Sequence, residues 1–264
     1  FKFVTVLVSL FWMAPRPDLE EATICNALST TAIAFVDPTT VFKVISPNAL
    51  RADDIAVVAA EKWLAEDIDC IIYVGGPFVS KQMAVFLEAK ANHVCHITQS
   101  YPPVVPLPTP SIRINMADLA NLTATAHAEI SMDNINQETR KRVSEQVASD
   151  EEWQIMHELL CKDPKGRIDC FVSNSLPIRY FDQLAPTHIR HFYCNRGASG
   201  IDGNIATIIG ACCEPSDVPL LAIVGDMATL YDLNAFLMMD KVRRPITIVI
   251  INNGGGCIFE RLPI

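Results

Sequence analysis

Three residues in the last third of the chain could together hold a divalent cation. Asp226, which follows Gly225, offers a carboxylate, and Asn253 offers an amide oxygen. Asn253 is followed by three glycines, which would let a backbone carbonyl approach closely, that of Gly255 in particular. Three such oxygen donors leave room in an octahedron for two phosphate oxygens and a water, the coordination that Mg²⁺ prefers.

Two predicted strands must position these residues. Gly225-Asp226 ends the apolar run Leu220–Val224, and Asn252-Asn253 ends the apolar run Ile246–Ile251. Strand, helix and strand predict a parallel pair with a crossover helix, and ligands of open parallel sheets lie beyond the carboxyl ends of the strands. We therefore expect both polar clusters to converge, although an ordinary βαβ unit with an Asn-Gly turn has the same pattern. Four apolar residues recur at helical spacing between the two runs: Leu233, Phe236, Leu237 and Met238.

A second polar cluster contains two arginines. Ser173-Asn174-Ser175 follows the predicted strand Ile168–Val172, and Arg179 lies one helical turn beyond Ser175. Arg196 lies in the glycine-spaced segment Asn195–Gly203, which enters a predicted helix of small residues. Arginine pairs with carboxylates through two parallel hydrogen bonds. Two arginines beside a cation site therefore favour a substrate with several carboxylates, and ordinary surface ion pairing is the alternative.

Composition limits the classes of protein that the chain can be. It has 264 residues, half of them apolar, which is enough for two domains with sizeable cores. The net charge is −9 and no basic block is present, which argues against a nucleic-acid partner. The nine cysteines form no C-x-x-C pair, which argues against a zinc ribbon, and their odd number favours a reducing compartment.

The amino-terminal half has an α/β pattern. The apolar segment Phe3–Ala14 is too short to span a bilayer, and we interpret it as containing a buried strand, with a signal segment as the alternative. The polar stretch Ser131–Glu152 predicts a helix or linker between two domains, 1–140 and 141–264. The predicted strands are Phe3–Leu10, Val41–Ile45, Cys70–Val74 and His93–Ile97, and the predicted helices are Asp53–Glu66, Ser80–Ala91 and Glu151–Cys161.

Together these motifs resemble one family, the 2-succinyl-5-enolpyruvyl-6-hydroxy-3-cyclohexene-1-carboxylate synthases, thiamine diphosphate-dependent enzymes of menaquinone and phylloquinone biosynthesis. The resemblance is dense over residues 168–264 and weak over 1–150. It rests on Asn174–Arg179 (NSLPIR), Asn195–Gly203 (NRGASGIDG), Gly225-Asp226 with Tyr231–Ala235 (YDLNA), Asn252–Phe259 (NNGGGCIF) and Leu262-Pro263.

The resemblance implies an α/β fold in which mostly parallel sheets are flanked by helices, with residues 1–140 as the family's central domain and 141–264 as most of its diphosphate-binding domain. It implies Mg²⁺, or Mn²⁺, held by Asp226, Asn253 and the Gly255 carbonyl. Cofactor contacts are implied for Gly225, Asp226, Met227, Asn253, Gly255, Ile258 and Phe259. Substrate contacts are implied for Asn174, Ser175, Arg179, Arg196, Phe259 and Leu262.

The implied activity is that of a transferase. It decarboxylates 2-oxoglutarate and adds the resulting succinyl carbanion to isochorismate, in sites formed between subunits of a homodimer or homotetramer. The family's activating glutamate lies in a pyrimidine-binding domain that we do not find in this chain, so we expect the chain alone to bind the cofactor weakly and turn over nothing. The family implies a bacterial cytoplasm or a plastid. The alternatives are another thiamine diphosphate-dependent 2-oxoacid decarboxylase or carboligase, and a non-catalytic remnant of the fold.

Overall fold

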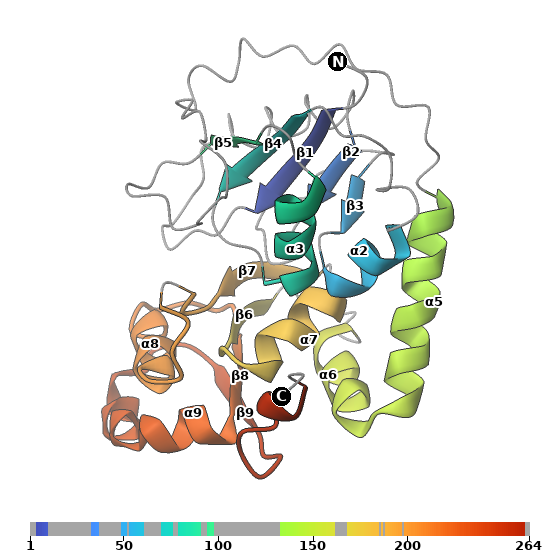
Figure 1. Ribbon diagram of the computed structural model, residues 1–264. Helices are drawn as coiled ribbons and strands as arrows, with labels where there is room; N and C mark the ends of the chain where they lie inside the picture. The colour runs from blue at the N-terminus through green and yellow to red at the C-terminus, as the bar shows by residue number, and fades with distance from the viewer. Residues whose placement is uncertain are drawn as a thin grey trace. The chain divides into compact units, whose positions relative to one another are not determined.

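The computed structural model consists of two compact units, Phe1–Glu151 and Glu152–Ile264 (Figure 1). The described residues are 4–9, 33–36, 49–51, 53–60, 70–75, 79–90, 94–97, 133–161, 168–184, 186, 188–196 and 198–261. The predicted boundary near residue 140 falls inside helix α5 (Asp133–Ser149), a continuous helix that packs against α2 (Asp54–Ala60) of the first unit.

The first unit contains a five-stranded parallel sheet with the order β3-β2-β1-β4-β5. The predicted strands Phe3–Leu10, Cys70–Val74 and His93–Ile97 are confirmed as β1, β4 and β5, whereas the predicted strand Val41–Ile45 lies outside the described residues. β2 and β3 were not predicted, because four and three residues are too short to show a clear pattern. The bounds are β1 (Val4–Ser9), β2 (Ile33–Val36), β3 (Ala49–Arg51), β4 (Cys70–Gly75) and β5 (Val94–Ile97).

Two helices of this unit are linked at their amino-terminal ends. Ser80 caps α3 (Lys81–Lys90), because its Oγ accepts a hydrogen bond of 3.0 Å from the Met83 N–H. The Ser80 hydroxyl donates in turn to Asp54 Oδ1 at 2.6 Å, and Asp54 is the first residue of α2. The α2 and α3 termini are therefore held together by one carboxylate.

The second unit contains a four-stranded parallel sheet with the order β7-β6-β8-β9. Gly225 and Ile251 pair at the carboxyl ends of β8 and β9. The two all-parallel sheets confirm the predicted α/β class. The bounds are β6 (Ile168–Val172), β7 (Ile189–Tyr193), β8 (Leu220–Gly225) and β9 (Ile246–Ile251).

Strand order in this unit reverses at β6. The chain runs from β6 through α7 (Leu176–Leu184) outward to β7, and then through α8 (Asn204–Ala211) back to β8, on the other side of β6. Because such crossovers are right-handed, the reversal places α7 on one face of the sheet and α8 on the other (Figure 1). Ligands of open α/β sheets bind where the strand order reverses, so the carboxyl ends of β6 and β8 are the expected site.

Helices cover both faces of this sheet. On the α7 face, α6 (Glu151–Cys161) packs through Trp153, whose ring centroid lies 5.3 Å from that of Tyr180 on α7. On the α8 face lies a buried core. Ten buried residues form it: Phe171, Ile205, Ile208, Ile209, Cys212, Leu220, Ala222, Val224, Ala228 and Ala235.

The crossover between β8 and β9 differs from the single predicted helix. It consists of α9 (Asp226–Tyr231) followed by a 3₁₀-helix, η1 (Leu233–Lys241). Ala235 is the buried residue of η1, whereas Leu233 and Leu237 are 51% and 84% exposed. The apolar residues at helical spacing therefore lie largely on the surface of the unit. Among the residues that the structure describes, no helix is long and apolar enough to cross a bilayer.

Candidate functional site

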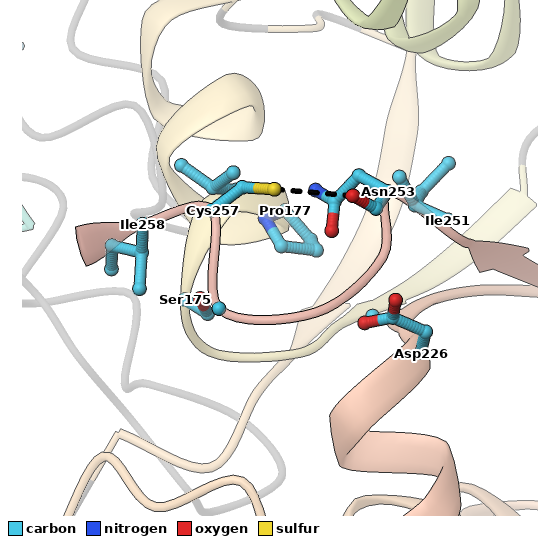
Figure 2. A pocket seen from close by; sticks show the side chains of 10 residues that line it. Ser175, Pro177, Asp226, Ile251, Asn253, Cys257 and Ile258 are labelled. Atoms are coloured by element: carbon cyan, nitrogen blue, oxygen red, sulfur yellow. Dashed lines mark hydrogen bonds between the residues drawn. The ribbon is translucent and has the colours of Figure 1, made fainter. Parts of the chain in front are cut away.

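A pocket of about 310 Å³, counted with the space that opens to solvent, lies at the carboxyl ends of β6, β8 and β9 (Figure 2). It brings Asp226 and Asn253 together, as the parallel strand pattern predicted. Residues that follow β6 also line the pocket, because β6 is adjacent to β8 where the strand order reverses. The lining residues are Ser175, Leu176, Pro177, Gly225, Asp226, Ile251, Asn253, Gly256, Cys257 and Ile258.

Asp226 is fixed by the junction between β8 and α9. The Gly225 N–H donates to Ser173 Oγ at 3.2 Å, and the Gly225 carbonyl accepts from the Thr229 hydroxyl at 2.9 Å. Asp226 is the first residue of α9, and its Oδ1 accepts a hydrogen bond of 2.7 Å from the Met227 N–H. These hydrogen bonds fix the strand-to-helix junction and orient the Asp226 carboxylate at the end of β8.

The glycine-rich loop after β9 passes close to this carboxylate. Gly254, Gly255 and Gly256 have φ angles of +86°, +82° and +71°, which glycine adopts far more readily than other residues. A Cβ on Gly255 would lie 4.0 Å from Asp226 Oδ2 and only 3.0 Å from Met227 Sδ. A side chain at Gly255 would therefore press against Met227, whereas its distance to Asp226 would be an ordinary van der Waals contact. Figure 2 shows the Asp226 carboxylate facing the loop that carries Asn253.

Two side chains, a thiol and an amide, form hydrogen bonds within the glycine-rich loop after β9. The Cys257 thiol donates to the Asn253 carbonyl at 3.2 Å, and Asn252 Oδ1 accepts from the Gly254 N–H at 3.3 Å. The first of these hydrogen bonds uses the backbone carbonyl of Asn253, and Asn253 itself lines the pocket.

The two arginines predicted as site residues both donate hydrogen bonds to one turn, Asn174-Ser175, which follows β6. Arg179 Nη1, from α7, donates to the Ser175 carbonyl at 2.6 Å, and Arg196 Nη1 donates to Asn174 Oδ1 at 3.4 Å. Ser175 has a φ of +77°, which is uncommon for a residue with a side chain and is often found at functional sites. The Arg196 Nε is buried and has no hydrogen-bond partner among the described residues. A buried guanidinium nitrogen of this kind is suited to an anionic ligand.

The residues present fit a hydrated divalent cation that carries a diphosphate. The donors are a carboxylate, a side-chain amide and backbone carbonyls, which are the oxygen ligands that Mg²⁺ takes. The glycine loop and the amino terminus of α9 offer backbone N–H groups to phosphate.

The other predicted site residues are placed as follows. Ile258 lines the pocket, and Met227 is 39% exposed, with its sulfur against Gly255. Phe259, which begins the short 3₁₀-helix η2 (Phe259–Arg261), is 62% exposed, and Leu262 lies outside the described residues. Arg179 and Arg196 donate to the Asn174-Ser175 turn, and neither they nor Asn174 are among the residues that line the pocket.

Some lining residues were not predicted as site residues. Pro177 and Cys257 occur within the motifs that carried the family resemblance, so the signal was in the sequence. Ile251 gave no signal, because the last residue of a buried strand looks the same whether or not a pocket lies above it.

Comparison with known proteins gives a consistent result. A curated relative from Roseiflexus castenholzii is 51% identical over 103 residues, and one from Actinobacillus succinogenes is 32% identical over 222 residues, which is 78% of this chain. Both are named 2-succinyl-5-enolpyruvyl-6-hydroxy-3-cyclohexene-1-carboxylate synthase. The chain is a homologue of these synthases.

The matched regions span 18% and 38% of the lengths of these two synthases. No family model matches the chain. A crystal structure from Mycobacterium smegmatis, of a protein proposed to be a thiamin diphosphate-dependent enzyme, superimposes with a TM-score of 0.63 over 99% of this chain and 52% of its own. Its sequence is 16% identical to this chain, so the similarity concerns the fold alone.

Proposed function

We propose that this chain is the cofactor- and substrate-binding part of a thiamine diphosphate- and Mg²⁺-dependent synthase, with Mn²⁺ as a possible replacement for Mg²⁺. The reaction joins the succinyl unit of 2-oxoglutarate to isochorismate with loss of CO₂. The single observation that carries the proposal is the convergence of Asp226, Asn253 and the glycine loop in one pocket. The names of the curated homologues support the choice of substrates.

The cofactor, when bound, supplies the electron sink for decarboxylation, so the protein mainly binds and orients. Asp226, Asn253 and the Gly255 carbonyl would hold the metal ion that carries the diphosphate. Ser175 and Ile258, on the pocket wall, would flank the reacting end of the cofactor. Positioning of this kind can account for a large part of a rate enhancement, because it removes the entropy cost of bringing the reactants together.

Arg179 and Arg196 support a substrate with several carboxylates. One guanidinium nitrogen of each arginine donates a hydrogen bond to the Asn174-Ser175 turn, and this bond orients the rest of the guanidinium. 2-Oxoglutarate carries a second carboxylate that pyruvate lacks, and hydrogen bonds to charged groups contribute about 1.5–3 kcal/mol each. A single such hydrogen bond to the second carboxylate would therefore favour 2-oxoglutarate over pyruvate by about 10- to 100-fold.

We also propose that the protein acts as a homo-oligomer. The side chains on α9 and η1 give the second unit a surface with several exposed apolar residues, which is typical of a surface that binds another protein. Its members are Leu230 (58% exposed), Tyr231 (66%), Leu233 (51%) and Leu237 (84%).

The decisive experiment assays the full-length gene product for consumption of 2-oxoglutarate. We expect CO₂ release that requires thiamine diphosphate, a divalent cation and isochorismate, with pyruvate about 10- to 100-fold poorer as donor. Equal use of pyruvate would point instead to another carboligase of the same cofactor class. Turnover that persists after chelation and removal of the cofactor would overturn the proposal.

A further inference from the structure

The side-chain amide of Asn174 is buried, and both its nitrogen and its oxygen form hydrogen bonds within the protein. It is 2% exposed, and its amide nitrogen donates to the Asn195 carbonyl at 2.6 Å and to the Gly200 carbonyl at 2.7 Å. Its amide oxygen accepts from Arg196 Nη1 at 3.4 Å. An asparagine amide has two N–H groups and one carbonyl oxygen, so these contacts engage both donors and the acceptor.

The two carbonyls that accept from Asn174 flank Arg196 in the sequence. Asn195 immediately precedes Arg196, and Gly200 follows four residues later. Asn174 therefore holds both ends of the short loop that carries Arg196 against the carboxyl end of β6. No other residue type of this size can donate to two carbonyls and accept from a guanidinium at once.

We propose that Asn174 is a positioning residue, which fixes the Arg196 loop and orients the Arg196 guanidinium toward a substrate carboxylate. This replaces the interpretation of Asn174 as a direct substrate ligand. The inference rests on the proposed function only for the identity of the carboxylate. The hold on the loop is a property of the described residues themselves.

The test uses two variants and one control. Asn174→Ala removes all three contacts. Asn174→Asp removes both donors to the loop carbonyls but places a carboxylate beside Arg196, where it would compete with an anionic substrate. Ser199→Ala is the matched control, because the exposed Ser199 hydroxyl donates to the Arg196 carbonyl at 3.1 Å from within the same loop.

The first measurement is the rate at which trypsin cuts after Arg196 in the native protein, followed by mass spectrometry. We expect both Asn174 variants to be cut at least about 10-fold faster than the wild type and Ser199→Ala to be cut at the wild-type rate. An unchanged rate would overturn the inference. Faster cleavage at every site would also overturn it, because Asn174 would then serve the stability of the whole unit.

The second measurement determines KM and kcat separately for 2-oxoglutarate in the full-length protein. We expect KM to rise about 10- to 100-fold, more in Asn174→Asp than in Asn174→Ala, while the affinity for Mn²⁺–thiamine diphosphate stays within about twofold of wild type. An unchanged KM in a protein with a loosened loop would overturn the positioning role. If the wild type itself does not consume 2-oxoglutarate, the proposed function fails, and the trypsin result alone decides whether Asn174 holds the loop.

Discussion

Asp226 follows β8 and Gly255 lies in the loop after β9, yet Asp226 Oδ2 is 4.0 Å from the position that a Cβ on Gly255 would occupy. The same position lies 3.0 Å from Met227 Sδ and 3.1 Å from Met227 Cγ. The glycine therefore allows the loop after β9 to close over the start of α9. Asp226 and two residues of this loop, Asn253 and Gly256, line the same pocket.

Gly255→Ala should weaken binding of the metal–cofactor complex more than Gly254→Ala does. Both glycines have a positive φ, so either alanine costs about 1–2 kcal/mol of backbone strain. A Cβ on Gly254 meets nothing within 4 Å, whereas a Cβ on Gly255 meets Met227. We expect similar losses of thermal stability in the two variants and a loss of Mn²⁺–thiamine diphosphate affinity mainly in Gly255→Ala, measured by calorimetry.

Met227→Ala should partly restore the affinity of Gly255→Ala, because it removes the sulfur that the new Cβ would meet. A double-mutant cycle measures this coupling directly. Strictly additive effects of the two substitutions would show that the Met227 contact does not limit the approach of the loop.

Asp226→Asn should reduce the affinity for Mn²⁺ by at least about 10- to 100-fold, because an amide oxygen replaces a charged ligand. Asp217→Asn is the matched control, since Asp217 is an exposed carboxylate outside the pocket lining. The measurement is Mn²⁺ binding by electron paramagnetic resonance in the presence of thiamine diphosphate. Wild-type affinity in Asp226→Asn would remove the basis for assigning a metal to this pocket.

Asp169→Asn should destabilise the protein without changing metal affinity. Asp169 is 1% exposed and accepts from Arg244 Nη2 at 2.7 Å and from Arg190 Nε at 3.1 Å, with His191 Nδ1 at 3.2 Å. Because Arg244 is 5% exposed, neutralising its partner leaves a buried charge, which costs about 3–5 kcal/mol.

Denaturant unfolding would measure this loss, and Asp240→Asn is its control. The Asp240–Lys241 pair is on the surface, where ion pairs contribute little, so this control should unfold like the wild type. Asp169 lies near the amino end of β6, opposite the pocket, so equal metal affinity is expected in both variants.

The thiols should differ in reactivity with iodoacetamide. Burial raises the pKa of the Cys170 thiol, and burial also raises the pKa of the Cys212 thiol. A raised pKa lowers the thiolate fraction at neutral pH, so these two should react slowly and should gain reactivity only as the pH rises well above the ordinary thiol range. Among the cysteines whose exposure the structure describes, Cys213 is exposed and should be labelled first. Peptide mass spectrometry after timed labelling at pH 7 and pH 9 would show this order.

The sequence alone predicted the α/β class, because buried strands followed by helices leave local patterns of apolar spacing and strand-ending residues. It also predicted that Asp226 and Asn253 would meet, since consecutive parallel strands end at the same edge of a sheet. The capping of α3 by Ser80 is also a local feature, because it depends on residues three positions apart.

The tertiary structure decided the features that depend on non-local pairing. β7 pairs on the outer side of β6, which leaves β6 next to β8 and brings Ser175 to the pocket that Asp226 and Asn253 line. Helical spacing of apolar residues predicted one crossover helix after β8, but the chain forms α9 and η1 and leaves Leu237 exposed. Spacing along a chain records which residues share a face, but only the packed neighbours determine whether that face is covered.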